Sequence, residues 1–128
     1  IITQKTLSDK PDGDPVKVGD NDRGVVWIAL GDWDYRKYGG TEQCPLEVNT
    51  TDKSTFFDRN SENVIAYGEL VLDESTDGWI NVEIPLEYHT LTRKPTHIVV
   101  SAAASLLGDY FTGSADSVMW LDALELVY

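Results

Sequence analysis

The feature that most constrains the fold is an alternation of apolar and polar residues with a period of two. It is clearest in "GWINVEIPLEY", residues 78–88, where Asn81, Glu83 and Glu87 share the intervening face with Trp79. A period of two is that of a β-strand with one buried face. We therefore expect a strand over 79–88 in which four side chains are buried on one face: Ile80, Val82, Ile84 and Leu86.

Other apolar runs of similar length are separated by clusters of Gly, Pro, Asp and Asn, which are typical of turns. The expected long strands span 23–33, 63–72, 96–105 and 117–127, and shorter strands are expected at 1–7 and 45–50. Within 51–59 the pattern suggests a helical turn with Thr51 as its N-cap. Six to eight short strands of this kind predict an all-β fold, an antiparallel β-sandwich.

The length and charge of the chain limit its partners. Its 128 residues, of which 41% are hydrophobic, are enough for a single domain with a core. The formal net charge of −12 repels phosphate backbones and anionic lipid headgroups, so nucleic acid and membrane insertion are not expected. The single cysteine, Cys44, excludes an internal disulfide and a cysteine-based zinc site.

Common catalytic motifs are missing from the sequence. It contains no metalloprotease, P-loop, nucleophile-elbow or dinucleotide-binding signature. His89 is expected in a loop and His97 on a strand face, so a structural role is favoured for both. We predict no cofactor.

One cluster of residues suited to sugar binding follows the expected strand 23–33. It runs from Asp32 to Gly40 and combines carboxylates, bases and aromatic rings. Sugars require this mixture, because the C–H face of a pyranose packs on an aromatic ring while its hydroxyls bond to carboxylates. The candidate binding residues in this cluster are Asp32, Trp33, Asp34, Tyr35 and Tyr38.

A second candidate cluster is the loop "GDYFTG", residues 108–113, which adds Asp109 and Tyr110 to the predicted binding residues. Successive residues of an extended segment point to opposite sides, so we expect Tyr110 to be exposed and Phe111 buried. In the alternative interpretation, which residue types alone favour, Trp33, Tyr110 and Phe111 fold back and cap the open end of the core.

Asp122 falls in register with the apolar residues Val118, Trp120, Leu124 and Leu126. A carboxylate there must be hydrogen-bonded, paired or bound to a cation. We favour a core carboxylate that accepts backbone N–H groups; the alternative is a ligand of a structural calcium ion.

Catalysis on a glycan would need two carboxylates facing each other across a cleft. The available candidates are Asp32, Asp34, Glu69, Asp109 and Asp122. The sequence does not say whether any two of them converge.

Five segments together resemble a known family. They are "ENVIAYGELVL" (62–72), "WINVEIPLEY" (79–88), "RKPTHIVVSAAAS" (93–105), "GDYFTG" (108–113) and "SVMWLDALELVY" (117–128). Their order is similar to that in the putative carbohydrate metabolism domain family. The resemblance is strongest from residue 94 onward, good from about residue 23 and weak before it.

The resemblance implies a jelly-roll β-sandwich of the galactose-binding or carbohydrate-binding-module type, in an exported bacterial protein of the periplasm or cell surface. Residues 1–128 would be one such domain, or the C-terminal part of a longer family domain. The family supplies no catalytic residues to carry over.

We therefore predict a non-catalytic module that binds an oligo- or polysaccharide in polysaccharide recognition or utilisation. The alternatives are a glycoside hydrolase that uses a carboxylate pair and a structural module of a surface assembly. An exposed groove with two rings would favour the first, a carboxylate pair with one desolvated member the second, and buried rings without a groove the third.

Overall fold

A computed structural model describes residues 1–3, 16–38, 40–49 and 51–127 of the chain. Within these residues the strands are β1 (Gly24–Gly31), β2 (Val64–Leu72), β3 (Glu87–Tyr88) and β4 (His97–Ala103). The helical elements are short: α1 (Tyr35–Tyr38), η1 (Lys53–Thr55) and η2 (Gly108–Tyr110). The fold is therefore all-β, as the sequence predicts.

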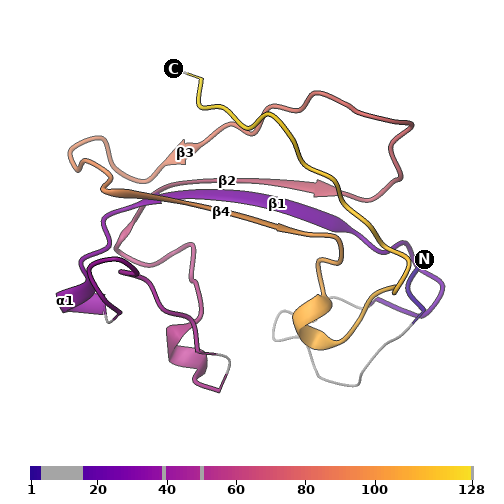
Figure 1. The fold of residues 1–128 in the computed structure, drawn as a ribbon, viewed down its shortest axis with the longest axis horizontal. Coiled ribbons are helices and arrows are strands. Elements are labelled where there is room, and N and C mark those ends of the chain that lie inside the picture. The colour runs from indigo at the N-terminus through magenta and orange to yellow at the C-terminus, as the bar shows by residue number, and fades with distance from the viewer. Residues whose placement is uncertain (4–15, 39, 50, 128) are drawn as a thin grey trace. The chain divides into compact units, whose positions relative to one another are not determined.

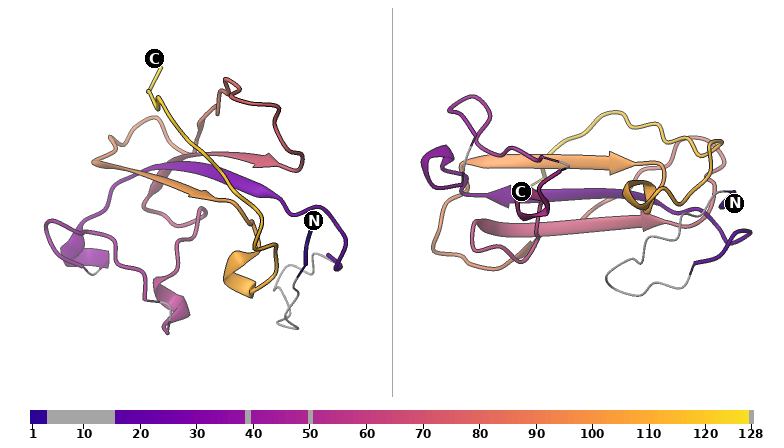
Figure 2. Two further views of the ribbon diagram at one scale, coloured as in Figure 1. Left: turned by 45° about the vertical axis from the view of Figure 1, so that its right-hand side comes forward. Right: turned by 90° about the horizontal axis from the view of Figure 1, so that it is seen from below.

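The strands form one antiparallel four-stranded sheet in the order β3-β2-β1-β4 (Figure 1). Figure 2 shows β1 running between β2 and β4. In the pairing of β2 with β3, Ala66 faces Tyr88 and Tyr67 faces Glu87. The sheet confirms the expected strands 23–33, 63–72 and 96–105, each shortened by a few residues at its ends.

By its internal contacts the chain divides into two compact units. Unit 1 comprises Ile1–Val26, Leu70–Val82 and Ala102–Tyr128, and unit 2 comprises Trp27–Glu69 and Glu83–Ser101. Strands β1, β2 and β4 contribute residues to both. A single domain over residues 1–128 stays a prediction.

Unit 2 holds the larger group of packed aromatic rings. Ala29, Trp33 and Val64 form a buried cluster, and the partly buried hydrophobic residues packed against it are Trp27, Leu46, Phe57, Tyr67 and Val99. The rings of Trp27 and Phe57 stack with their centroids 4.4 Å apart. Gly31 admits the Trp33 ring, because a Cβ at residue 31 would lie 2.5 Å from it.

In unit 1 the first residues are tied to the turn before β1. The Ile2 N–H donates to the Asp20 carbonyl at 2.7 Å, and the Gly19 N–H donates to the Ile2 carbonyl at 3.0 Å. Ile2 and Leu107 are buried apolar residues of this unit. Residues 4–7 of the short strand expected at 1–7 lie outside the described residues.

The expected strand 79–88 is wrong over most of its length, because only Glu87–Tyr88 pairs with a neighbour. Ile80 and Val82 are 53% and 45% exposed instead of buried, while Ile84 and Leu86 are half-buried. Pro85 gives the physical reason. It has no N–H to donate to a ladder with β2, so the pairing is confined to Glu87 and Tyr88, which come after it in the chain.

The expected strand 117–127 is also not formed: these residues have no strand structure, and their large apolar side chains are mostly exposed. A strand requires a hydrogen-bonded neighbour, which an apolar pattern cannot supply by itself. Residues 45–49 likewise have no strand structure. The turn within 51–59 is confirmed as η1, but its N-cap is Asp52 rather than Thr51.

Candidate functional site

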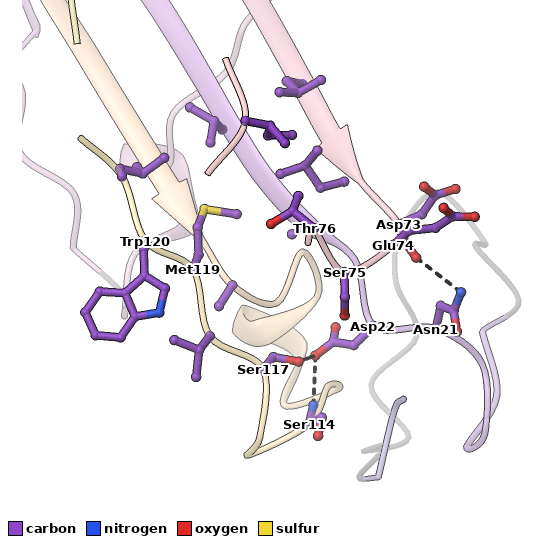
Figure 3. Close-up of a pocket in the computed structure, with 18 of the residues that line it drawn as sticks. Asn21, Asp22, Asp73, Glu74, Ser75, Thr76, Ser114, Ser117, Met119 and Trp120 are labelled. Carbon is purple, nitrogen blue, oxygen red and sulfur yellow. Dashed lines mark hydrogen bonds between the residues drawn. The ribbon is translucent and has the colours of Figure 1, made fainter. Parts of the chain in front are cut away.

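Unit 1 contains a cleft of about 950 Å³. Its walls come from the residues before β1, from the end of β2 with the loop that follows, and from 114–121 (Figure 3). Its apolar lining residues include Val26, Leu70 and Met119. Its polar lining residues are Asn21, Asp22, Asp73, Glu74, Ser75, Thr76, Ser114, Asp116 and Ser117.

Two tryptophans also line the cleft and remain open to solvent. Trp79 is 71% exposed and Trp120 is 77% exposed. Figure 3 shows Trp120 on one side of the cleft, with Asp73 and Glu74 on the other. A large apolar ring left in water loses the free energy that burial would give it, so exposed rings at a cleft indicate a binding surface.

Asp22 connects the residues before β1 with the loop after β4. Its Oδ2 atom accepts hydrogen bonds from the Ser105 Oγ at 2.6 Å, the Ser117 Oγ at 2.6 Å and the Ser114 N–H at 2.9 Å. Gly113 allows this approach, because a Cβ there would lie 2.7 Å from the Ser105 Oγ. The bond from Ser117 thus anchors the wall of the cleft formed by residues 114–121, three residues before Trp120.

The pKa of Asp22 reflects two opposing causes. Burial raises it, but the hydrogen bonds from Ser105, Ser117 and Ser114 outweigh burial and hold the pKa below its usual value of 3.8. Asp22 therefore remains a carboxylate at neutral pH and acts as an acceptor at the base of the wall.

A second anchor joins the residues before β1 to the loop after β2. The Asn21 Nδ2 donates to the Asp73 carbonyl at 3.1 Å. The bond uses the backbone of Asp73 and leaves its carboxylate at the cleft, which Asp73 lines beside Glu74. This hydrogen bond therefore holds the backbone of the segment that carries Asp73 and Glu74.

The predicted residues 32–38 lie in unit 2 and make local contacts. Asp32 pairs with Arg93, whose Nη2 lies 3.3 Å from the Asp32 Oδ2. Trp33 is buried at 3% exposure in the core cluster. The Asp34 Oδ1 accepts the Arg36 N–H at 3.0 Å and so caps α1.

Tyr35 and Tyr38 are the first and last residues of α1. The Tyr35 ring lies under the Arg36 guanidinium, whose carbon is 5.0 Å from the ring centroid. The side chain of Tyr38 lies outside the description. Asp32 is therefore engaged in an ion pair, Trp33 in core packing and Asp34 in helix capping. Tyr35 contacts Arg36.

The loop 108–113 differs from the extended segment assumed for it. Gly108–Tyr110 form the 3-10 turn η2, and Phe111 ends it with a left-handed backbone at φ 51° and ψ 34°. Phe111 is 76% exposed, so its expected burial is wrong, and Tyr110 is half-buried. The alternation argument fails because a 3-10 turn does not place successive residues on opposite sides. Asp109, in the same turn, is exposed.

Asp122 is exposed, and its Oδ1 accepts the N–H of the next residue, Ala123, at 2.8 Å. The expectation of a core carboxylate is therefore wrong. Among the residues that the structure describes, no three His, Cys, Asp or Glu side chains gather closely enough to hold a metal ion. A calcium role for Asp122 stays a prediction.

One feature of the sequence, Trp79, points to the cleft. Trp79 occupies the polar face of the alternating segment 78–88, where a large ring is out of place unless it has a function. Trp120 is not marked in this way, because it shares its register with Val118 and Leu124, and this pattern predicts a strand with Trp120 on its apolar face.

A family model described as putative carbohydrate metabolism domain matches residues 5–127. The chain belongs to this family. The match also covers the first part of the chain, where the sequence resemblance was weak. No match was found among curated proteins or among solved structures. In the described part of this family member, none of the helices has the length and apolar composition to cross a membrane.

Proposed function

We propose that the chain is a non-catalytic carbohydrate-binding module and that the unit 1 cleft is its binding site. The observation that carries this proposal is the pair of exposed indoles, Trp79 and Trp120, beside hydroxyl, amide and carboxylate groups in one cleft. Membership of a family described as a putative carbohydrate metabolism domain supports a sugar-related ligand.

The chemistry of the lining suits a sugar. An indole offers a flat apolar surface to the C–H face of a pyranose. Serine, threonine and asparagine side chains both donate and accept, as sugar hydroxyls do, and carboxylates accept from two hydroxyls at once. The cleft volume of about 950 Å³ lies at the upper end of the range for ligand sites and suits several sugar units rather than one.

Two features favour binding over the alternatives. A retaining or inverting hydrolase needs one carboxyl group with a raised pKa to act as an acid; Asp22 does not suit that role, because the hydrogen bonds from the wall lower its pKa. A purely structural module would bury its rings, whereas Trp79 and Trp120 are exposed.

The finer fold and the location belong to the same proposal. We infer that the four-stranded sheet is one layer of a galactose-binding-like jelly-roll sandwich, as the family resemblance implies. Export to the periplasm or cell surface, as the family resemblance implies, would place the module where polysaccharides occur.

The test is a glycan-array screen of the purified chain, followed by titration of the glycans that bind. We expect Trp79→Ala and Trp120→Ala each to weaken binding about tenfold or more, while the fold survives. The control is Tyr88→Ala, which removes a half-exposed ring outside the cleft and should leave affinity unchanged. Glycan binding that is insensitive to both tryptophans would exclude this cleft as the site.

The residues predicted from sequence form a second candidate surface for the same function. Asp109 and Tyr110 lie on the exposed turn η2, outside the cleft lining. Tyr110→Ala in the same titration separates the two surfaces: a loss equal to that of Trp120→Ala would extend the site to η2.

A further inference from the structure

We infer that the cleft selects uncharged glycans and rejects those that carry uronate or sulfate groups. This inference rests on the proposed function and adds a ligand class to it. It starts from an imbalance in the lining, which contains four carboxylates, Asp22, Asp73, Glu74 and Asp116. Within the described residues, no Lys, Arg or His side chain lines the cleft.

An anionic glycan would find no compensating charge there. Protein sites for carboxylate and sulfate groups use Arg, Lys or clustered backbone N–H groups as partners. Here the Ser114 N–H is already bonded to Asp22, as are the hydroxyls of Ser105 and Ser117. The donors nearest the base of this wall are therefore already used by a protein carboxylate.

The same carboxylates attract a neutral sugar. Each oxygen can accept from a sugar hydroxyl, and two adjacent hydroxyls can share one carboxylate. A uronate or sulfate on the same ring adds Coulomb repulsion, which costs about two- to sixfold in affinity for each like-charge pair 4–8 Å apart in water. The overall net charge of −12 acts in the same direction at low ionic strength.

Asp73 and Glu74 are the groups best suited to a test. They follow β2 directly and lie together on one side of the cleft (Figure 3). The hydrogen bond from Asn21 goes to the backbone carbonyl of Asp73, so a change of the Asp73 side chain leaves this anchor in place. Asp22 is unsuitable, because its carboxylate holds the wall.

The experiment is an array of matched polymers that share a backbone and differ in the charge of their substituents. The probes are polygalacturonan and its fully methyl-esterified form, carboxymethyl- and hydroxyethyl-cellulose, and sulfated and desulfated galactan, among neutral plant and microbial glycans. We expect each neutral member to bind more tightly than its anionic partner, several-fold at low salt and by a smaller factor at physiological salt. Binding to an anionic member as tightly as to its neutral partner would overturn the charge selection and leave the carbohydrate-binding proposal standing. Binding to no glycan would overturn both.

A charge-neutralised pair of variants assigns the selection to the cleft. Asp73→Asn combined with Glu74→Gln should raise affinity for the anionic members about three- to tenfold at low salt, and the gain should shrink as salt screens the charges. The control, Asp77→Asn with Glu125→Gln, makes the same change of net charge at exposed positions outside the lining. An equal gain in the control would mean that net charge, and not the cleft, rejects anions.

Discussion

The aromatic side chains of the two units differ in what covers them. In unit 2, Trp27, Phe57 and Tyr67 pack on one another, and Trp33 is buried beside Ala29 and Val64. In unit 1, Trp79 and Trp120 line a cleft and remain exposed. Residue type alone therefore does not separate a ring that stabilises the fold from a ring that is available to a ligand.

The difference has an energetic meaning. A buried tryptophan contributes its whole transfer free energy to folding, which at about 25 cal/mol per Å² amounts to several kcal/mol. An exposed indole has not released that free energy, so a flat ligand can still gain it. The comparison therefore predicts large stability effects in unit 2 and large binding effects in unit 1.

The largest effect is expected for Trp33→Ala. Removing a ring that is 3% exposed leaves a cavity and should cost about 3–5 kcal/mol in the free energy of unfolding. Trp120→Ala is the matched variant with the same change of side chain and should cost less than about 1 kcal/mol. Urea denaturation of both variants measures the difference, and equal losses would end the distinction between the two units.

Much of the sheet was predictable, because a buried strand is marked by local pattern. "RGVVWIALG" and "VIAYGELVL" became β1 and β2. The wrong strands had equally clear patterns but lacked something that the pattern does not contain. For 79–88 the missing element was the N–H of Pro85, and for 117–127 it was a neighbouring strand.

The candidate site was harder to predict for a similar reason. The cluster 32–38 has the composition of a sugar site, but Asp32 pairs with Arg93 and Trp33 enters the core. Arg93, the partner of Asp32, and Val64, in the core cluster with Trp33, are both distant in sequence. The cleft in turn is assembled from three segments, around positions 22, 74 and 120, that no spacing rule connects. Only the misplaced ring of Trp79 could have pointed to it.

A smaller effect is expected at the anchor of the unit 1 wall. Asp22→Ala removes an acceptor of three hydrogen bonds and should cost about 1–3 kcal/mol. Asp22→Asn keeps an oxygen that can accept from the same donors, so it should cost less. If the wall is needed to place Trp120, Asp22→Ala should also weaken glycan binding under conditions where the chain stays folded.

The pH dependence of stability provides a separate measurement of this anchor. Because the pKa of Asp22 is lower in the folded chain than its usual value of 3.8, its contribution is present above that value. The contribution is lost as the pH falls through the folded pKa. Asp22→Asn should therefore flatten the acid limb of the stability curve below about pH 4, and an unchanged limb would contradict the assignment.

The smallest effect is expected at the edge of the unit 2 ring stack, where it would sharpen the contrast between the units. Burial and, after it, the hydrogen bond that the Tyr67 hydroxyl donates to the Glu69 Oε2 at 2.7 Å raise the pKa of Tyr67 to about 12. The folded pKa is above the unfolded value, so the stabilising contribution is present below about pH 10 and is lost as the pH rises through about 12.

Absorbance titration of the phenolate measures this value, and Tyr67→Phe identifies the signal among the six tyrosines. Glu69→Gln removes the neighbouring charge and should lower the pKa of Tyr67 while leaving the ring stack intact, because burial, the larger cause, remains. The variant thus separates the charge from the packing. If Tyr67 titrates near its ordinary value of 10.0, its ring is solvated and the unit 2 stack is as open as the rings of unit 1.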